Sequence, residues 1–332
     1  MDLTALAGHT RGSTSHDQGA DAAQVSQGLR QGPSGVSPGA QGHLAMLAFS
    51  ALVAGSFSLG SIMANEIAPT AFTALRFCLA SLFVGLLAAQ RRELTSQNFA
   101  APWRFAILGG LFGLYFVLMF EGLRTAPPVS AAAVFTLVPL MAAGFAYFLL
   151  RQMMTGRMAL ALAIGGVGAL WVIFRGDFGA ALAFDVGRGE AIYFVGCVSH
   201  AIYTPMVRRL NRGESAVVST LGTVLAGALL LGLYAWPEIG ATDWAALPAM
   251  VWITLFYTAF FATAVTVILL QFATLRLPSA KVMAYTYLTP TWVIAWEISL
   301  GNTPPGAMVL VGVGLTVVAL LLLLRDDQPA PL

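Results

Sequence analysis

A few ionisable side chains interrupt the long apolar runs of this sequence, and these residues have the chemistry to bind a solute. Arg76 and His200 both stand well inside such runs. A guanidinium can bind a carboxylate, and an imidazole can carry a proton near neutral pH or contact a substrate. Because charged and polar groups are costly inside a bilayer, both are candidates for function. Each also has a structural interpretation: Arg76 paired with Glu66 or Glu121, and His200 neutral and bonded to a neighbouring hydroxyl.

A second group of candidates follows one face of a helix. Lys281 is the chain's only lysine, and Tyr285, Thr289 and Trp292 follow it at helical spacing. An ammonium at one end of this face could bind an anionic group while the rings hold an apolar or cationic portion. Alternatively, Lys281 extends to the membrane surface and the tryptophans of this segment form an interfacial belt. Further residues that could line the same cavity are Tyr115, Tyr203 and Thr263.

The sequence offers little for catalysis. It contains neither H-E-x-x-H nor G-x-S-x-G, and it lacks the phosphate-binding pattern G-x-x-x-x-G-K-[ST]. Cys78 and Cys197 lie in apolar runs without metal-ligand spacing, which favours a packing role for both. We therefore expect no enzyme activity, no cofactor, no metal, no nucleic-acid partner and no direct use of ATP.

The composition is that of a polytopic membrane protein. The chain is 58% hydrophobic and 10% charged, whereas about a quarter of the residues of a soluble chain are charged. Ten apolar runs, each about long enough to cross a bilayer, predict an all-α bundle of ten transmembrane helices. The runs are 44–63, 69–89, 104–123, 128–149, 157–174, 190–209, 215–235, 247–270, 279–299 and 306–324.

The segment before the first run has a different composition. Residues 1–42 are rich in Gly, Ser, Gln and Ala, lack aromatic residues and show no features of a signal peptide, so we predict a disordered tail. With this tail inside, ten arginines fall in cytoplasmic segments and three in outer loops. That asymmetry predicts a multi-pass protein of the cell (inner or plasma) membrane with both termini in the cytoplasm.

The chain contains an internal repeat. Pro127 and Pro139 recur 151 positions later as Pro278 and Pro290. Five crossings in each half is an odd number, so the halves, 43–175 and 187–325, must have opposite orientations. Such inverted repeats place the substrate near the midplane between the halves. We expect Pro139 and Pro290 to break their helices and to act as hinges.

These motifs resemble those of the EamA-like members of the drug/metabolite transporter superfamily. PTAFTALRFCLAS carries Arg76 and Phe77 in the manner of the family's RF pair, and EGLRTAPPVSAAAVFTLVPL and GEAIYFVGCVSHAIYTPMVRRL are similar to later helices. The resemblance covers about 43–325. One departure is that Arg151 and Asn302 stand where the family commonly has a glutamate twelve residues after the repeat proline.

The resemblance implies a secondary transporter. The substrate would be a small organic metabolite, amino-acid-like or drug-like, moved by alternating access of a monomer or homodimer in the lipid bilayer, and the resemblance favours export. Protons as the coupling ion and facilitated diffusion are both open. The alternatives are a sugar-phosphate or nucleotide-sugar carrier of the same superfamily, a membrane-embedded enzyme, and a non-transporting membrane subunit.

Overall fold

A computed structural model of the 332-residue chain describes residues 37–183, 185–274, 276–277 and 279–324. The described residues form helices and connecting loops, with no strand among them. Most of the predicted tail therefore lies outside the described residues. Its last residues, however, belong to the first helix, α2, which begins at Pro38 instead of 44. Ser37 caps this helix by accepting a hydrogen bond from the Ala40 N–H at 3.3 Å, and a proline fits the first helical turn.

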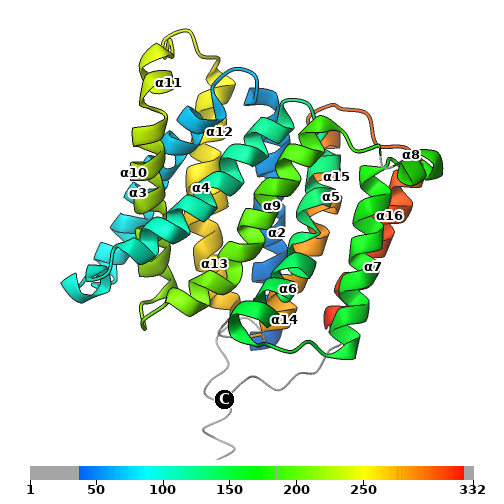
Figure 1. The fold of residues 1–332 in the computed structure, drawn as a ribbon, viewed down its shortest axis with the longest axis horizontal. Helices are drawn as coiled ribbons and strands as arrows, with labels where there is room; N and C mark the ends of the chain where they lie inside the picture. The colour runs from blue at the N-terminus through cyan, green and yellow to red at the C-terminus, as the bar shows by residue number, and fades with distance from the viewer. Residues whose placement is uncertain (1–36, 184, 275, 278, 325–332) are drawn as a thin grey trace, which may run out of the picture.

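The predicted crossings are all present, and they lie side by side in one bundle (Figure 1). Eight segments are long and apolar enough to span a membrane. The other two are α9, which carries three arginines, and the interrupted segment from α14 to α15. In chain order the elements are α2 (Pro38–Met63), α3 (Pro69–Gln90), α4 (Trp103–Leu123), α5 and α6 (Pro128–Phe135 and Val138–Leu150), α7 (Gly156–Ile173), α9 (Arg188–Leu210), α10 (Ala216–Tyr234), α12, η2 and α13 (Ala249–Ala259, Phe260–Val265 and Thr266–Thr274), α14, η3 and α15 (Ser279–Ala284, Tyr285–Leu288 and Thr289–Ser299) and α16 (Ala307–Leu324).

Three short helices in the connections were not predicted. They are η1 (Ser96–Phe99), α8 (Phe178–Ala183) and α11 (Trp236–Ala241). Each has at most six residues, too few to show a helical hydrophobic period.

The fourth and ninth crossings are both broken just before a proline. Helix α5 ends at Phe135 and α6 begins at Val138, so that Pro139 is the second residue of α6. In the ninth crossing a 3₁₀ turn ends at Leu288, and Pro290 is the second residue of α15. Proline lacks the N–H that a continuous helix needs and clashes with the preceding turn, so each break follows from the sequence. Hinge motion at these breaks stays a prediction.

The two halves repeat their contacts as well as their sequence. A Cβ built on Gly42 of α2 would lie 2.9 Å from Leu277, and one on Gly189 of α9 would lie 2.6 Å from Ala126. Ala126 and Leu277 are 151 positions apart, the same offset as the repeated prolines. The first helix of each half therefore packs against the start of the fourth helix of the other half.

Glycines allow two pairs of helices to approach closely. A Cβ on Gly109 of α4 would lie 2.5 Å from the backbone nitrogen of Gly227 of α10. A Cβ on Gly168 of α7 would lie 2.7 Å from the carbonyl oxygen of Gly312 of α16. Lipid gives helices little hydrophobic reason to associate, so close backbone contact of this kind is a main source of packing energy.

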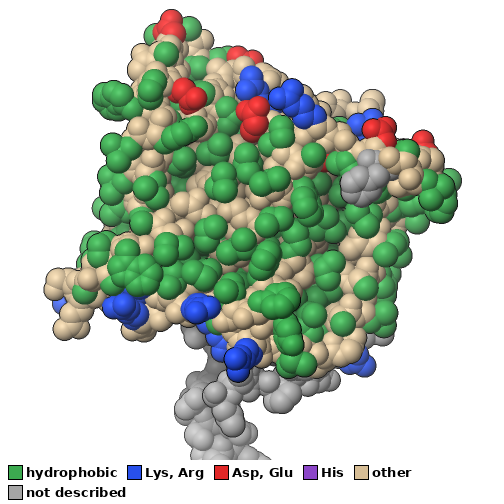
Figure 2. Space-filling model, in the orientation of Figure 1, with side chains coloured by type: hydrophobic (Ala, Val, Ile, Leu, Met, Phe, Trp, Pro, Cys, Tyr) green, Lys and Arg blue, Asp and Glu red, His purple; other side chains and the backbone are tan. Residues whose placement is uncertain are grey.

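The two ends of the bundle differ in charge. Helix α2 begins and α16 ends at the same end, the lower one in Figure 1, which we call the N-terminal end. In the view of Figure 2, this edge carries basic side chains, whereas the opposite edge carries acidic and basic side chains together.

Candidate functional site

Arg76 is buried inside the bundle and has no carboxylate partner among the residues that the structure describes. Its side chain on α3 is 1% exposed, and its guanidinium carbon lies 3.7 Å from the centre of the Phe116 ring of α4. The single hydrogen bond runs from Nη2 to Thr263 Oγ1 at 3.3 Å, while Nε and Nη1 are buried without a partner. The structure therefore does not show the ion pair with Glu66 or Glu121 that the structural interpretation required.

The ion pairs of the described residues use other arginines. Glu121 accepts from Arg124 at 3.1 Å, and the remaining pairs are Arg91–Glu93 and Arg104–Glu214. A buried charge without a counter-ion is costly, so a group of opposite charge from outside the chain would be strongly favoured at Arg76.

A π-helical turn in the eighth crossing places the partner of Arg76. Within η2, the Thr263 hydroxyl donates to the carbonyl oxygen of Thr258 at 2.9 Å, which leaves its lone pairs free to accept from Arg76. Thr266 Oγ1 in turn donates to the Thr263 carbonyl at 3.0 Å. Single π turns inside α-helices are frequent at functional sites because they redirect side chains and carbonyls.

Aromatic rings extend from Arg76 into the second half of the molecule. We call Phe112, Tyr115, Phe116, Phe135, His200 and Tyr203 the aromatic cluster. The Phe112 and Phe116 ring centres are 4.8 Å apart, and Phe112 lies 4.8 Å from Tyr203. Several rings are nearly parallel: Phe112 makes angles of 19° with Tyr115 and 20° with Tyr203. The cluster thus connects Arg76 on α3 with α4 and α9.

His200 lies inside this cluster. Its ring centre is 4.4 Å from that of Tyr115 and 5.6 Å from that of Tyr203, and its Nδ1 atom is buried without a hydrogen-bond partner. Tyr115 also exchanges a hydrogen bond with Tyr193 at 3.0 Å between the hydroxyl oxygens. The Nδ1 atom of His200 therefore does not make the hydrogen bond to a neighbouring hydroxyl that the structural interpretation expected.

The Lys281 face forms a separate group against α2. Tyr285 bonds to His43 at 2.8 Å between Oη and Nδ1, and Trp292 Nε1 donates to Ser50 at 3.0 Å. Lys281 itself interacts electrostatically with His43. Thr289, the first residue of α15, donates to the carbonyl of Thr286 in the preceding 3₁₀ turn at 2.7 Å. The interactions of Lys281, Tyr285 and Trp292 are thus with α2 and not with Arg76, and the hydrogen bond of Thr289 stays within the ninth crossing.

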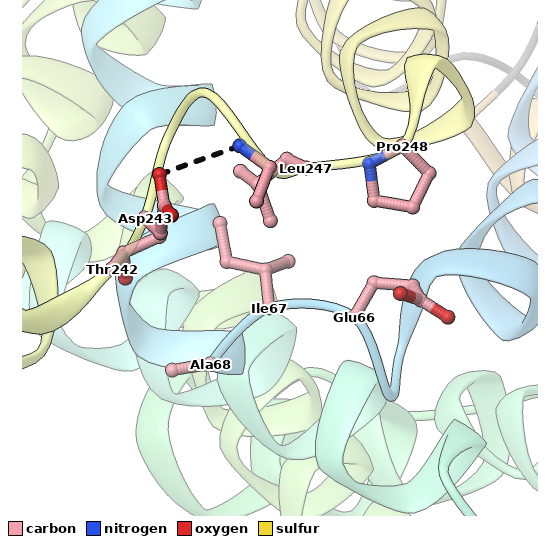
Figure 3. A pocket seen from close by; sticks show the side chains of 8 residues that line it. Glu66, Ile67, Ala68, Thr242, Asp243, Leu247 and Pro248 are labelled. Carbon is pink, nitrogen blue, oxygen red and sulfur yellow. Dashed lines mark hydrogen bonds between the residues drawn. The ribbon is translucent and has the colours of Figure 1, made fainter.

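Two cavities have linings that include neither Arg76 nor the aromatic cluster. One, of about 310 Å³, opens at the end opposite the N-terminal end between the α2–α3 and α11–α12 connections. Figure 3 shows Asp243 and Glu66 on opposite sides of it, with Asp243 accepting from a backbone N–H of its own loop, that of Ala246, at 3.4 Å. The other, of about 520 Å³, is lined by apolar side chains of α3 and α12, including Leu79 and Trp252.

Five of the nine predicted contact residues therefore meet in one place: Arg76, Tyr115, His200, Tyr203 and Thr263. The predicted residues did not include Phe112, Phe116 or Phe135, because phenylalanine in an apolar run ordinarily serves packing. One signal was available: Phe112, Tyr115 and Phe116 have the spacing of one helical face.

Similarity to known proteins agrees with this fold. The model of the EamA-like transporter family matches residues 40–174 and again residues 187–325. The chain is 24% identical to the uncharacterized transporter YyaM of Bacillus subtilis (strain 168) over 285 residues, which are 84% of this chain and 92% of that protein. It is 28% identical to the aromatic amino acid exporter YddG of Ancylobacter novellus over 216 residues, 63% of this chain and 72% of that protein.

A solved crystal structure of a protein 20% identical in sequence has a TM-score of 0.62 and covers 86% of this chain and 95% of its own, which supports the shared fold. Two successive matches to one family model account for nearly all of the described residues. The chain is a membrane-embedded small-molecule transporter and belongs to the EamA-like transporter family of the drug/metabolite transporter superfamily.

Proposed function

We propose that this protein is a secondary transporter that moves a small organic solute across the cytoplasmic membrane by alternating access. The inverted repeat supports this mechanism, because two similar halves of opposite orientation can exchange conformations about a central site. The excess of basic residues in the loops of the N-terminal end supports a cytoplasmic position for that end.

The observation that carries the proposal is the buried arginine at the boundary of the two repeats, which has no carboxylate partner among the described residues. Arg76 and Phe116 come from the first half, whereas Thr263 and His200 come from the second half. A site assembled from both halves changes whenever the halves move relative to each other. In this structure Arg76 and Tyr115 are buried, with exposed fractions of 1% and 3%, so a solute reaches these residues of the site only after a change of conformation. The cycle must therefore open the site first to one side and then to the other.

Two features support export of an amino-acid-like solute. One relative is named as an aromatic amino acid exporter, and the aromatic cluster suits a flat apolar side chain. The sugar-phosphate alternative is less well supported, because a phosphate is usually bound by several basic groups, and the contacts of Arg76 include none.

The test is solute flux through liposomes that contain the purified protein in a known orientation. Liposomes are preloaded with a panel of labelled amino acids and aromatic metabolites, and release is compared with that from protein-free liposomes. We expect release of at least one solute by wild-type protein and by the control Arg151→Gln, which changes an exposed arginine. Release no faster than in protein-free liposomes for every solute in either orientation would contradict a transport function.

A further inference from the structure

We propose that Arg76 binds the carboxylate of a monoanionic substrate whose flat, apolar body lies against the aromatic cluster. This inference rests on the proposed function, because it assigns a substrate class to the same central site. Three independent features of the site support it: an unused charge, the shape of the group that carries the charge, and the arrangement of the rings beside it.

The charge of Arg76 is not neutralised by the described part of the chain. Two of its three side-chain nitrogens have no hydrogen-bond partner, and the third reaches a neutral hydroxyl, that of Thr263. The Phe116 ring under the guanidinium contributes a cation–π contact, which leaves the edge of the guanidinium available. A bound anion would supply both the missing charge and the missing hydrogen-bond acceptors.

The guanidinium favours a planar anion. Arginine presents its N–H groups in a rigid fork that matches the two oxygens of a carboxylate. The contacts of Arg76 bring no second lysine or arginine to the site. Lys281 instead interacts with His43 on α2. A single cation balances a single negative charge, so a monocarboxylate fits better than a phosphate ester with two charges.

Phe116 under the guanidinium stands at 77° to Phe112, but several of the rings beyond it are nearly parallel to one another. Phe77 makes an angle of 14° with Phe112, and His200 makes an angle of 21° with Tyr203. Nearly parallel rings on three helices can open into a slot with flat walls, which would accept an aromatic ring by stacking. The unpartnered Nδ1 of His200 then offers one polar contact within that slot.

The experiment compares ligands that share one body and differ in the head group. Binding of 3-phenylpropanoate, 3-phenylpropanamide and 3-phenylpropylamine to the full chain in nanodiscs is measured by isothermal titration calorimetry at pH 7. We expect the carboxylate to bind and the neutral and cationic analogues to bind at least about 30-fold more weakly, since a buried charged partner would be left unpaired.

Two variants locate the binding. Arg76→Gln is expected to lose at least about 30-fold in affinity for the carboxylate, and Arg76→Lys is expected to recover only part of it because a lysine keeps the charge but not the fork. The matched control Arg151→Gln should bind as wild type does. Gel filtration and thermal unfolding of each variant show whether it is folded, and the head-group comparison in wild-type protein does not depend on any variant.

Several results would overturn the inference. They are equal affinity for the amine or amide and the carboxylate, unchanged carboxylate affinity in a folded Arg76→Gln protein, and binding of chloride or phosphate at Arg76 without binding of the carboxylate. A fourth result is that nanodiscs of phosphatidylglycerol stabilise the wild-type protein more than nanodiscs of phosphatidylcholine, that Arg76→Gln abolishes this difference, and that the carboxylate does not bind. The liposome test distinguishes failure of the proposed function from failure of this inference. If the carboxylate binds but no solute is released, the transport function is contradicted. If cationic solutes are released and Arg76→Gln does not slow their release, this inference is contradicted.

Discussion

Arg76 and Arg104 are buried to the same extent, yet their surroundings are opposite. Arg104 is 2% exposed and uses all three side-chain nitrogens: Nη2 pairs with Glu214 Oε1 at 2.6 Å, Nη1 donates to the Leu210 carbonyl at 2.7 Å, and Nε donates to the Ala101 carbonyl at 3.3 Å. Arg76 has one hydrogen bond and no carboxylate. The bonds of Arg104 hold segments of the fold together, whereas Arg76 is the arginine to which we assign a ligand.

The difference follows from where each arginine stands along its helix. Arg104 lies in the first turn of α4, beside the last turn of α9, whose final carbonyls have no partner within the helix. Arg76 lies within α3, where backbone carbonyls are already bonded in the helices. Its one acceptor, Thr263, is available because of the π turn in the eighth crossing. Partners for a buried arginine are thus plentiful at a helix end and scarce in the middle of a bundle.

The largest effect expected from this comparison is on transport. Replacing Arg76 with leucine should lower solute flux at least about 30-fold, because the substrate loses its buried partner. It should leave thermal stability unchanged or raise it, because an uncompensated buried charge is removed. Flux in liposomes and thermal unfolding of the same preparation provide the two measurements. Loss of stability comparable to that of an Arg104 variant would assign Arg76 a structural role.

The second largest effect is on stability. Replacing Arg104 with leucine should destabilise the protein by about 3–5 kcal/mol, because Glu214 is then buried without its partner. The double variant with Glu214→Gln should lose less than the sum of the two single variants, as expected for a coupled pair. Unfolding of the four proteins in one detergent measures this, and strictly additive losses would contradict the coupling.

A third prediction concerns acid. Burial opposes ionisation of Glu214, but hydrogen bonds from Arg104 and from the backbone N–H of Arg212 outweigh it and lower the pKa of the carboxyl from 4.5 to about 2. Since the folded pKa is the lower one, the ionised carboxylate stabilises the fold above pH 4.5, and this contribution is lost as the pH falls from 4.5 towards 2. The melting temperature of wild type should therefore fall more steeply below pH 4.5 than that of Glu214→Gln. Parallel curves would contradict the shift.

The smallest effect expected is at the acceptor of Arg76. Thr263→Val removes the hydroxyl that receives the Nη2 hydrogen bond, so the guanidinium should be held less firmly and flux should fall about five-fold to ten-fold, which corresponds to the net contribution of about 1 kcal/mol of a typical hydrogen bond. Thr263→Ser keeps the hydroxyl and is the matched control. If valine and serine variants transport equally well, Thr263 does not position Arg76.

The sequence by itself determined the crossings, the repeat and the positions of the helix breaks. In lipid every backbone group must be bonded within a helix, so the length of an apolar run is a sufficient signal. Proline acts on its own turn, and the breaks before Pro139 and Pro290 could therefore be predicted locally. The start of α2 at Pro38 was missed, because its first residues are polar and its signals are Ser37 and the proline itself.

Only the tertiary structure decided which polar side chains meet. Arg76 and Thr263 are 187 positions apart, and Tyr285 and His43 are 242 apart. Whether two such residues face each other depends on how each helix is rotated and on which neighbour it packs against, and neither is encoded in the hydropathy of a single run. Hence Lys281, the chain's only lysine, interacts with α2, as does Trp292. Arg76 instead lies against rings of α4, with two of its nitrogens unpaired.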